Sequence, residues 1–396
     1  MTPHRTDHAC RLMAVGDIML HGRIYEAVER GTDPLSLWSG IAPLLAQADL
    51  VFGNLETMVS AAGIPRPGTM GRYRSPAGTG QVLARLGFSF VNIGHNHALD
   101  WGAEGVACTT RELDAAGVAW GGIGPAPEAA SRPAYVCCPR CGRRFAFVCF
   151  TATYNTLDPS LGGTGCAVPP PARLRSLLTR VRNQADVVVV SIHGGACLNP
   201  WPSPQMLSWC RGAAAAGADI VLGHHAHISN GLEVRAGRLI AYALPDCIRS
   251  FPWESDEAWE RMVRPRHDTF ILDVHLPPAA PLRWEIIPCI LDASLTPRPA
   301  RGDDAERIQE QIATLSHDIT TGRSTAHHYA HASRDFGAIY GASLWRTFRT
   351  GGLRWLVRRI ITLRPYHLGI VVRALRGQVR SRRGEQTPSA AGQADS

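Results

Sequence analysis

Short apolar runs alternate with segments of helical spacing over most of the chain, and this alternation predicts an α/β fold. The runs that predict strands lie at 12–15, 49–52, 88–93, 118–120, 186–192 and 220–222. The segments that predict helices lie at 23–30, 35–46, 76–86, 104–116, 171–184 and 205–216. Hairpins are predicted at 135–150 and 232–244, and alternating strands at 269–276 and 282–290. This order favours two packed sheets with helices outside rather than one doubly wound sheet.

The strand predicted at 220–222 ends in a glycine and three nearby histidines. Gly223 permits a tight exit from the strand, and His224, His225 and His227 follow it. Neutral imidazoles two positions apart in such a loop can share an ion such as Zn, Mn or Fe. For this segment taken alone, the alternative is a polar loop with chance histidines.

Four other predicted strands run into side chains of the same chemical kinds. These side chains are Asp17 and His21, Asn54 and Glu56, Asn96 and His97, and His193. We expect each junction just beyond the end of its strand, where open α/β sheets carry their sites. Carboxylate, amide and imidazole ligands suit a pair of divalent ions about 3.5–4 Å apart, bridged by one carboxylate. One histidine must then stay off the metal to protonate the leaving group.

Five motifs in register resemble those of the CapA family of poly-γ-glutamate capsule synthesis proteins, which are related to calcineurin-like metallophosphoesterases. The motifs are Gly16-Asp17, Asn54-Leu55-Glu56, Asn96-His97-Ala98-Leu99-Asp100-Trp101-Gly102, His193-x-Gly195, and Gly223-His224-His225-x-His227 followed by Glu233. The resemblance implies a four-layered α/β/β/α sandwich of the metallophosphoesterase type and a site for two divalent metal ions. It also implies a role in making capsule, poly-γ-glutamate or a related anionic polymer.

The resemblance assigns the predicted metal ligands to two ions, which could be Mn, Zn or Fe. Asp17 and His227 would belong to one ion. The other ion would take Asn96, His193 and His225. The bridging ligand would be Glu56, with Asn54 as the alternative.

The resemblance also places the catalytic residues. His97 would stand where the phosphoesterase relatives have their proton donor, and Asp100 would orient it. The chain departs from the family pattern after His193, where neither Trp nor an acidic residue follows. Pro245-Asp246-Cys247 stands in place of the usual Gly-Asn-Phe, and the usual N-terminal membrane anchor is not visible.

Candidate substrate-binding residues are His21 and the arginines of a predicted surface loop at 64–75. Arg72 and Arg74 could face an anionic substrate across the site, and a solvated loop is the alternative. The predicted function is a dinuclear-metal hydrolase acting on a phosphoester or an amide-linked anionic polymer. The alternative function is a non-catalytic accessory protein that docks on a membrane polymer synthase.

Charge and composition separate the end of the chain from the rest. The 396 residues are 45% hydrophobic and 19% charged, which excludes global disorder. The net charge is +8, and all 41 basic residues are Arg. Eleven of them lie between Trp345 and Arg383, where there is no Asp or Glu. We therefore predict a CapA-type domain at 10–295 and a helical, Arg-rich extension with a disordered end at 296–396.

The basic extension could bind an anionic membrane surface or a membrane synthase, or pack on the main domain with its arginines outward. Nucleic acid is not favoured as a partner, because no recognised module surrounds the arginines. No secretory signal or membrane span is evident, and the eleven Cys form no even framework. These features predict a cytoplasmic protein, with membrane association through the extension left open.

Two of the cysteines form half of a zinc knuckle. Cys138-Pro139-Arg140-Cys141-Gly142 occupies the turn of the hairpin predicted at 135–150. A structural zinc needs four ligands, and no second Cys-x-x-Cys is present. Cys149 and Cys166 are further candidate ligands, and a hairpin with reduced thiols is the alternative.

Overall fold

The computed structural model describes residues 8–59, 73–151, 164–165, 168–250, 268–292 and 296–335. The chain divides into two compact units, Met1–Gly322 and Arg323–Ser396. In the second unit the described element is helix α10 (Ser324–Asp335). All the sheets belong to the first unit, which therefore contains every strand named below.

The first sheet combines a parallel part with an antiparallel part. Its parallel strands are β1 (Cys10–Met19), β2 (Leu50–Leu55), β5 (Phe88–Asn92) and β6 (Ala119–Gly121). Its antiparallel strands are β16 (Asp268–Leu276), β17 (Arg283–Leu291) and β18 (Pro297–Pro299). The order is β18-β17-β16-β1-β2-β5-β6, and β15 (Ile248–Arg249) pairs with the end of β1.

The second sheet has the order β13-β14-β12-β11-β9-β8. Its parallel strands are β9 (Arg144–Thr151), β11 (Val187–His193), β12 (Ile220–His224) and β14 (Arg238–Ala241). The outer strands β8 (Ala134–Cys137) and β13 (Leu232–Arg235) pair antiparallel with their neighbours. Two short pairs complete the strands: β3 (Met58–Val59) with β4 (Arg74–Ser75), and β7 (Ile123–Gly124) with β10 (Thr164–Gly165).

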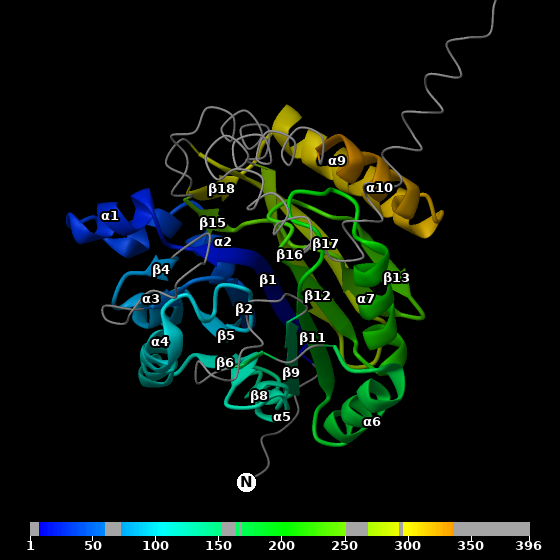
Figure 1. Ribbon diagram of the computed structural model, residues 1–396, viewed down its shortest axis with the longest axis horizontal. Helices are drawn as coiled ribbons and strands as arrows, with labels where there is room; N and C mark the ends of the chain where they lie inside the picture. Colours follow the sequence, from blue (N-terminus) through cyan, green and yellow to red (C-terminus); the bar gives the residue numbers. More distant parts are fainter. Residues whose placement is uncertain are drawn as a thin grey trace, which may run out of the picture. The chain divides into compact units, whose positions relative to one another are not determined.

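The two sheets pack on each other through aromatic side chains. Phe52 of β2, Phe90 of β5 and Phe147 of β9 are all buried. The Phe90 and Phe147 ring centroids lie 4.3 Å apart, and Phe52 lies 6.0 Å from Phe147. Since these strands are covered on both faces, they read as continuous apolar runs in the sequence. Figure 1 shows the two sheets side by side.

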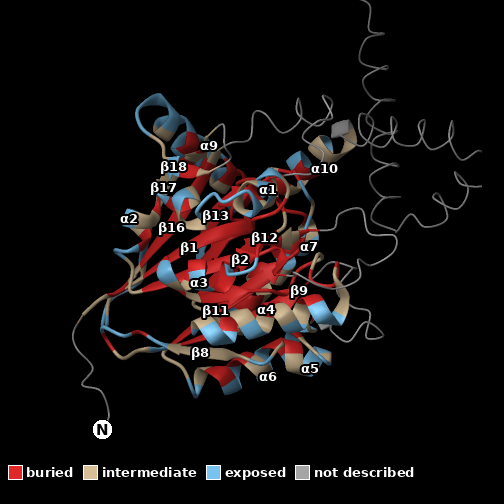
Figure 2. Ribbon diagram, turned by 90° about the vertical axis from the view of Figure 1, so that its left-hand side faces the viewer, coloured by how far each residue is buried: buried red, intermediate tan, exposed pale blue. Residues whose placement is uncertain are grey.

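Helices cover the outer face of each sheet. The helices of the first unit are α1 (Arg23–Glu29), the 3-10 helix η1 (Pro34–Trp38), α2 (Ala42–Leu45), α3 (Thr79–Arg85), α4 (Gly102–Ala116), α5 (Pro127–Ala130), α6 (Pro171–Arg182), α7 (Pro204–Ala216) and α9 (Asp303–Thr320). Leu83 and Leu113 of α3 and α4 share a core with the first sheet. Leu178 and Cys210 of α6 and α7 share another core with the second sheet. In Figure 2 the strands between them are almost wholly buried.

These findings confirm a mixed α/β protein with several sheets, and both predicted hairpins are present. The single helix predicted at 35–46 is wrong, because η1 and α2 replace it. Gly40 lies between them, and a Cβ atom there would stand 2.5 Å from the Pro297 carbonyl oxygen. Beyond residue 295, β18 pairs with β17, and α9 packs on β13 and β17.

No helix among the described residues is both long enough and apolar enough to cross a membrane. The Arg-rich segment 345–383 and the predicted disordered end lie outside the described residues.

Candidate metal centre

The ends of strands from both sheets meet at one place. Asp17 of β1 pairs in register with Asn54 of β2, and His193 of β11 pairs with His224 of β12. The backbones approach each other closely here. A Cβ atom on Gly16 would lie 2.0 Å from the Pro245 carbonyl oxygen. Only glycine permits this approach, so the glycine before Asp17 serves to bring β1 close to the chain before β15.

Asp17, Glu56 and His193 converge at the centre of this place. All three side chains are fully buried. Each offers one ligand atom such that the three atoms lie within 4.8 Å of one another. His193 Nε2 lies 3.4 Å from Glu56 Oε1. Three residues far apart in the sequence are therefore close enough to share an ion.

His227 joins a second group of possible ligands. Its Nδ1 lies 3.3 Å from Asp17 Oδ2 and 3.8 Å from Glu56 Oε2. The same nitrogen lies 2.9 Å from Asp246 Oδ1. Asp17, His227 and Asp246 form one compact group, and Glu56, His225 and His227 form another. Asp17, Glu56 and His227 each belong to two groups, which is the arrangement that adjoining ions require.

The loop after β12 is held in an unusual backbone conformation. His225 has φ of 90° and His227 has φ of 59°, although neither is glycine. Such conformations cost roughly 1–3 kcal/mol each and persist only where surrounding contacts fix them. The backbone N–H of His225 donates to Asp17 Oδ2 at 3.3 Å. This backbone conformation directs the imidazoles of His225 and His227 toward the carboxylates of the centre.

Burial and mutual repulsion dominate the electrostatics of the centre. Burial and the neighbouring Asp17 charge raise the pKa of Glu56 well above its ordinary value. Burial also opposes ionisation of Asp17, but hydrogen bonds to His224 and His227 hold its pKa well below the usual range. Burial and the nearby His227 lower the pKa of His225 to about 3. The imidazole of His225 is therefore neutral, as a metal ligand must be.

Several buried oxygen and nitrogen atoms at these strand ends lack a hydrogen bond, and they suit a divalent cation. Among the described residues, no hydrogen-bond donor reaches either oxygen of Glu56, although both are buried. Nδ1 of His225 is likewise buried without a hydrogen bond inside the described part of the chain. Buried polar atoms normally have partners, and unsatisfied ones indicate an ion or water. Carboxylate oxygen with imidazole nitrogen is the donor set of Zn, Mn or Fe.

The side-chain amides of Asn96 and Asn54 are oriented differently toward the centre. Asn96 Oδ1 lies 2.8 Å from His193 Nε2, beside the nitrogen that faces Glu56. Asn54 Nδ2 donates to Asp17 Oδ1 at 2.8 Å, while its oxygen accepts from Asn92 Nδ2 at 2.7 Å. With these amide orientations Asn54 positions the carboxylate of Asp17 and turns its own oxygen away from the centre.

His97 and Asp100 form a separate pair beside the ligands. His97 Nδ1 lies 2.8 Å from Asp100 Oδ2, and the Tyr73 backbone N–H donates to the same oxygen at 3.2 Å. The His97 side chain is 13% exposed, whereas the Asp100 carboxyl is buried. The Tyr73 ring lies 4.1 Å from the His97 ring and 4.2 Å from the His21 ring. The His97 imidazole is therefore held by Asp100 and by the Tyr73 ring, and part of it remains exposed to solvent.

The three predicted substrate-binding residues differ in their surroundings. His21 is buried against Tyr73, and burial lowers its pKa to about 3. The Arg74 guanidinium lies over the rings of Tyr25 and Trp101, at 4.6 and 5.1 Å from their centroids. Arg72, like Arg66, lies outside the described residues.

Two contributors were missed by the sequence analysis. Asp246 completes a ligand group, and its other oxygen accepts from the buried Arg249 at 2.6 Å. His224 is buried with Nδ1 at 3.6 Å from Asp17 Oδ1. The prediction that every junction lies beyond its strand is wrong for Asp17, Asn54 and His193, which lie inside β1, β2 and β11. A register irregularity between Ala14 and Asp17 turns β1 at this point, so the strand continues past the site.

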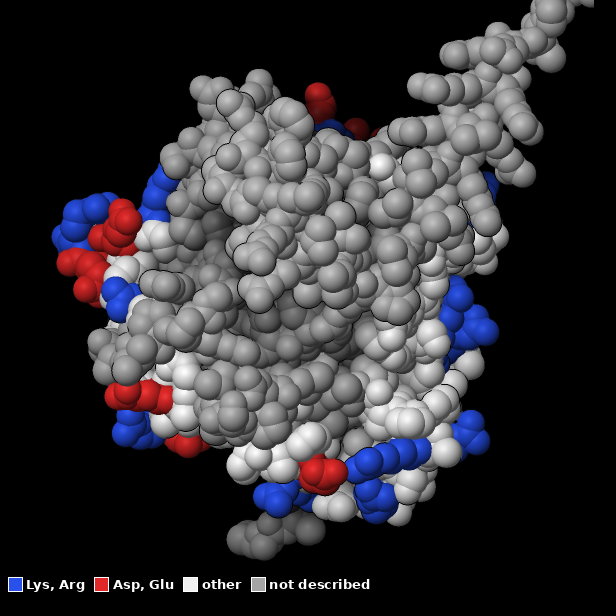
Figure 3. All heavy atoms as spheres, in the orientation of Figure 1, with Lys and Arg blue, Asp and Glu red and all other residues white. Residues whose placement is uncertain are grey.

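The surface around the fold carries charges of both signs. Figure 3 shows described Arg and carboxylate side chains around the margin of one face.

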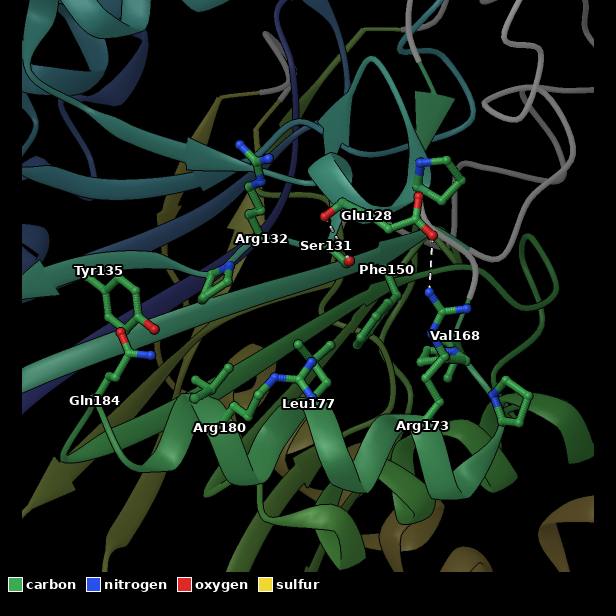
Figure 4. Close-up of a pocket in the computed structure, with 15 residues that line it drawn as sticks. Glu128, Ser131, Arg132, Tyr135, Phe150, Val168, Arg173, Leu177, Arg180 and Gln184 are labelled. Carbon is green, nitrogen blue, oxygen red and sulfur yellow. Dashed lines mark hydrogen bonds and ion pairs between the residues drawn. The ribbon is translucent and has the colours of Figure 1, made fainter.

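A cavity of about 680 Å³ lies between α5, α6 and β9, and Figure 4 shows the side chains that line it, including Glu128, Tyr135 and Arg173. Its lining contains no predicted site residue, so it is separate from the metal centre.

Comparisons of the sequence with known proteins find relatives among proteins of capsule synthesis. A family model described as bacterial capsule synthesis protein PGA_cap matches residues 11–250, which include every candidate ligand. The PGA biosynthesis protein CapA of Bacillus subtilis is 26% identical over 298 residues, covering 74% of each chain. The capsule biosynthesis protein CapA of Bacillus anthracis is 25% identical over 325 residues, covering 78% of this chain and 74% of the relative. Among solved structures, a 5'-nucleotidase from Candida albicans is 11% identical with a TM-score of 0.42, over 81% of this chain and 60% of that longer chain.

Proposed function

The chain belongs to the bacterial capsule synthesis protein family PGA_cap, and on that premise we propose that it is a dinuclear-metal hydrolase. Its substrate is a phosphoester or an amide-linked anionic polymer, in the synthesis of capsule, poly-γ-glutamate or a related material. The observation that carries the proposal is the convergence of Asp17, Glu56, His193 and His227 around buried, unsatisfied oxygens. A site of this composition serves little structural purpose, because it places like charges together in the core.

The ligand atoms divide between two adjoining positions. Asp17, His227 and Asp246 would hold one ion, and His193 with Asn96 and His225 would hold the other. Glu56 faces both groups and would bridge them. When bound, the ions would supply Lewis-acid stabilisation of negative charge and an activated water.

His97 is placed to handle the proton of the leaving group. Its Nδ1 proton is held by Asp100, so that Nε2 is the atom that exchanges a proton with substrate. Asp100 is fixed in turn by the Tyr73 backbone N–H, and it would hold the imidazole in this orientation. His21 and Arg74 would line the approach for an anionic substrate, together with Arg72.

The architecture and domain division are part of the same proposal. The two sheets with their outer helices would form the four-layered α/β/β/α sandwich of metallophosphoesterases. Residues 296–396 would include a helical, Arg-rich extension that brings the enzyme to an anionic membrane surface or a membrane synthase in the cytoplasm.

The test is turnover of a chromogenic phosphoester and of an amide-linked polyglutamate by the purified chain loaded with Mn or Zn. The proposal predicts turnover of at least one substrate that is abolished by His225→Ala. His317→Ala, which removes an exposed histidine of α9, serves as the matched control and should keep full activity. Metal binding without turnover of either substrate would contradict the enzymatic proposal.

That negative result would support the alternative function, an accessory protein that docks on a membrane polymer synthase. The observation in its favour is the charge of the extension, which has eleven Arg and no carboxylate between Trp345 and Arg383. Such a segment gains roughly 1 kcal/mol per Arg near an anionic membrane surface. Retention of the full chain on anionic vesicles, lost in a chain ending at residue 335, would identify this role.

A further inference from the structure

Three cysteines that are distant in the sequence meet at the opposite end of β1 from the metal centre. Cys10 is the first residue of β1, and Cys138 and Cys141 lie in the turn between β8 and β9. Their sulfur atoms lie within 4.8 Å of one another. The three residues are at most 1% exposed. No other group of three cysteines within this distance occurs in the described parts of the chain.

The turn between β8 and β9 is built to present its two sulfurs on the same side. The backbone N–H of Cys141 donates to Cys138 Sγ at 3.4 Å. The Gly142 N–H donates to the Cys138 carbonyl oxygen at 2.9 Å, and Gly142 has φ of 71°, which favours glycine. A backbone N–H that points at sulfur stabilises the thiolate over the thiol. The turn is therefore suited to a ligand that binds thiolates.

Packing of neutral thiols does not account for this convergence. Free thiols are weak hydrogen-bond donors, and they gain little from a turn that fixes two of them on the same side of the chain. A cation with an affinity for sulfur would convert all three to thiolates.

We propose that Cys10, Cys138 and Cys141 bind a structural zinc ion. Sulfurs held at about 2.3 Å from one tetrahedral zinc lie roughly 3.8 Å apart, so the observed group needs to contract by at most about 1 Å. Zinc also prefers thiolates to oxygen ligands, unlike Mn. The sequence motif identified only Cys138 and Cys141. The folding of β1 beside the turn supplies Cys10 in place of Cys149, and Cys166 lies outside the described residues.

His8 is the candidate for the fourth donor, and it would have to move toward the three sulfurs, because its ring nitrogens do not lie within 4.8 Å of all of them. It precedes Cys10 by two residues, so in an extended chain both side chains lie on the same face. His8 Nε2 lies 3.4 Å from Arg140 Nη1 of the knuckle turn and 3.4 Å from Asp49 Oδ2. A carboxylate on one imidazole nitrogen leaves the other to bind metal, which is the usual arrangement of zinc-bound histidine.

This zinc would be separate from the proposed hydrolytic centre and would serve stability. Asp17 follows Cys10 by seven residues along β1, which corresponds to about 23 Å at 3.3 Å per residue. β1 belongs to the first sheet, whereas β8 and β9 belong to the second. The ion would therefore join the two sheets at the edge where their common core ends.

The test is the absorption spectrum of the full chain, purified under reducing conditions, stripped of metal and titrated with Co²⁺. Cobalt bound to thiolate gives a charge-transfer band in the near ultraviolet, whereas cobalt bound by carboxylate and imidazole does not. We expect the band in the native chain and in Glu56→Gln, and its loss in Cys138→Ser. Cys210→Ser removes an equally buried cysteine of α7 and should keep the band.

Zinc analysis gives an independent measurement that does not depend on whether a variant folds. After stripping and reloading with Zn²⁺, the native chain should hold one zinc ion that excess Mn²⁺ does not displace. His8→Ala should keep the cobalt band and bind zinc more weakly, and unchanged affinity would remove His8 from the site. Absence of the cobalt band in the native chain would overturn the proposal. If the native chain were lighter than its sequence by two hydrogen atoms, and reduction removed this difference, the group would contain a disulfide between two of the cysteines. That result would also overturn the zinc proposal.

Discussion

Glu56 is the residue whose surroundings most favour a cation in the proposed centre. Its carboxyl group is fully buried, it stands beside Asp17, and no described residue donates a hydrogen bond to it. An uncompensated buried carboxylate costs several kcal/mol of stability. The apo protein can avoid this cost by protonating Glu56, which is the direction in which burial and Asp17 shift its pKa. Metal binding must then displace that proton.

Glu56→Gln separates the binding of metal from the stability of the fold. Glutamine has the same shape and no charge, so the apo variant should be as stable as the native chain or more stable. Metal affinity should fall at least about 100-fold, since even loss of a residue that only orients a ligand costs 10–100-fold. Calorimetric titration with Mn²⁺ and thermal unfolding measure the two effects. An apo variant that unfolds at a much lower temperature would show that Glu56 serves the fold.

His97 is expected to act on the leaving group and not on the metal. His97→Ala should keep the metal content and lower kcat by about 10²–10⁴-fold for a phosphoester with a poor leaving group. For a good leaving group such as nitrophenolate the loss should be much smaller, because that group needs no proton. Kinetics with a series of aryl and alkyl phosphoesters measure the difference. An equal loss across the series would contradict the role of proton donor.

The residues of the centre differ in how far the sequence could predict them. Asp17, Glu56, His193, His225 and His227 follow strand-forming runs in motifs, and the structure brings all five together. Asp246 was missed because it stands where the family has another residue, although it follows the hairpin predicted at 232–244. Its place depends on the close approach of the chain before β15 to Gly16. A contact of that kind leaves no local pattern in the sequence.

At the scale of elements, the site depends on close packing between backbones. A Cβ atom on Gly223 of β12 would lie 2.0 Å from the Tyr242 carbonyl oxygen. Neither backbone can move without moving the strands that position His224 and His193. The glycines of the motifs are therefore structural requirements of the metal centre, although they bind nothing themselves.

Gly223→Ala should destabilise the protein by about 1–3 kcal/mol or more, because the added methyl group collides with backbone. Gly212→Ala is the matched control, since Gly212 lies in α7 with no atom within 4 Å of the added Cβ. That substitution should stabilise the protein by about 0.5–1 kcal/mol through helix propensity. Denaturant unfolding measures both. Similar effects of the two substitutions would contradict the account of the close approach.

A hydrogen-bonded group fixes β13 and β14 to α7. Glu233 accepts from the Tyr242 hydroxyl at 2.6 Å and from Arg211 Nε at 2.9 Å. Burial opposes its ionisation, but these bonds lower the pKa of Glu233 below its ordinary value. The resulting stability is fully present above a pH of about 4.5 and is lost as the pH falls through the lower folded value.

Glu233→Gln should therefore destabilise the protein at pH 7 by about 1–2 kcal/mol, with a smaller difference below pH 4. Glu310→Gln changes an exposed residue of α9 and should have little effect at either pH. Unfolding by urea at several pH values measures the difference. A destabilisation that grows as the pH falls would contradict the lowered pKa.

The elements themselves were largely predictable, and the failures have physical causes. Runs such as 186–192 are strands because their side chains are buried on both faces, and the sequence shows this directly. The segment 35–46 has helical spacing, but Gly40 packs against Pro297 and the helix is interrupted. Tertiary contact there overrides local propensity, which no local pattern reveals.

At the scale of the whole first unit, the centre exists because two sheets meet. β1 and β2 supply carboxylates, while β11 and β12 with the loop that follows supply imidazoles. The sequence predicted two sheets, and the ligand types at the strand ends predicted that these ends converge. The convergence is a property of the packed unit, and each sheet alone would hold half of the ligands. The same holds for the cysteine group at the other end of β1.

The most direct test of this account is anomalous X-ray scattering from crystals grown with Mn²⁺. We predict two anomalous peaks between Asp17, Glu56, His193 and His227, with Asp246 on one of them. The Glu56→Gln variant, crystallised in the same way, should lose at least one peak. Crystals of the native chain with no anomalous peak between these four side chains would contradict the central claim, because the residues would then converge without binding metal.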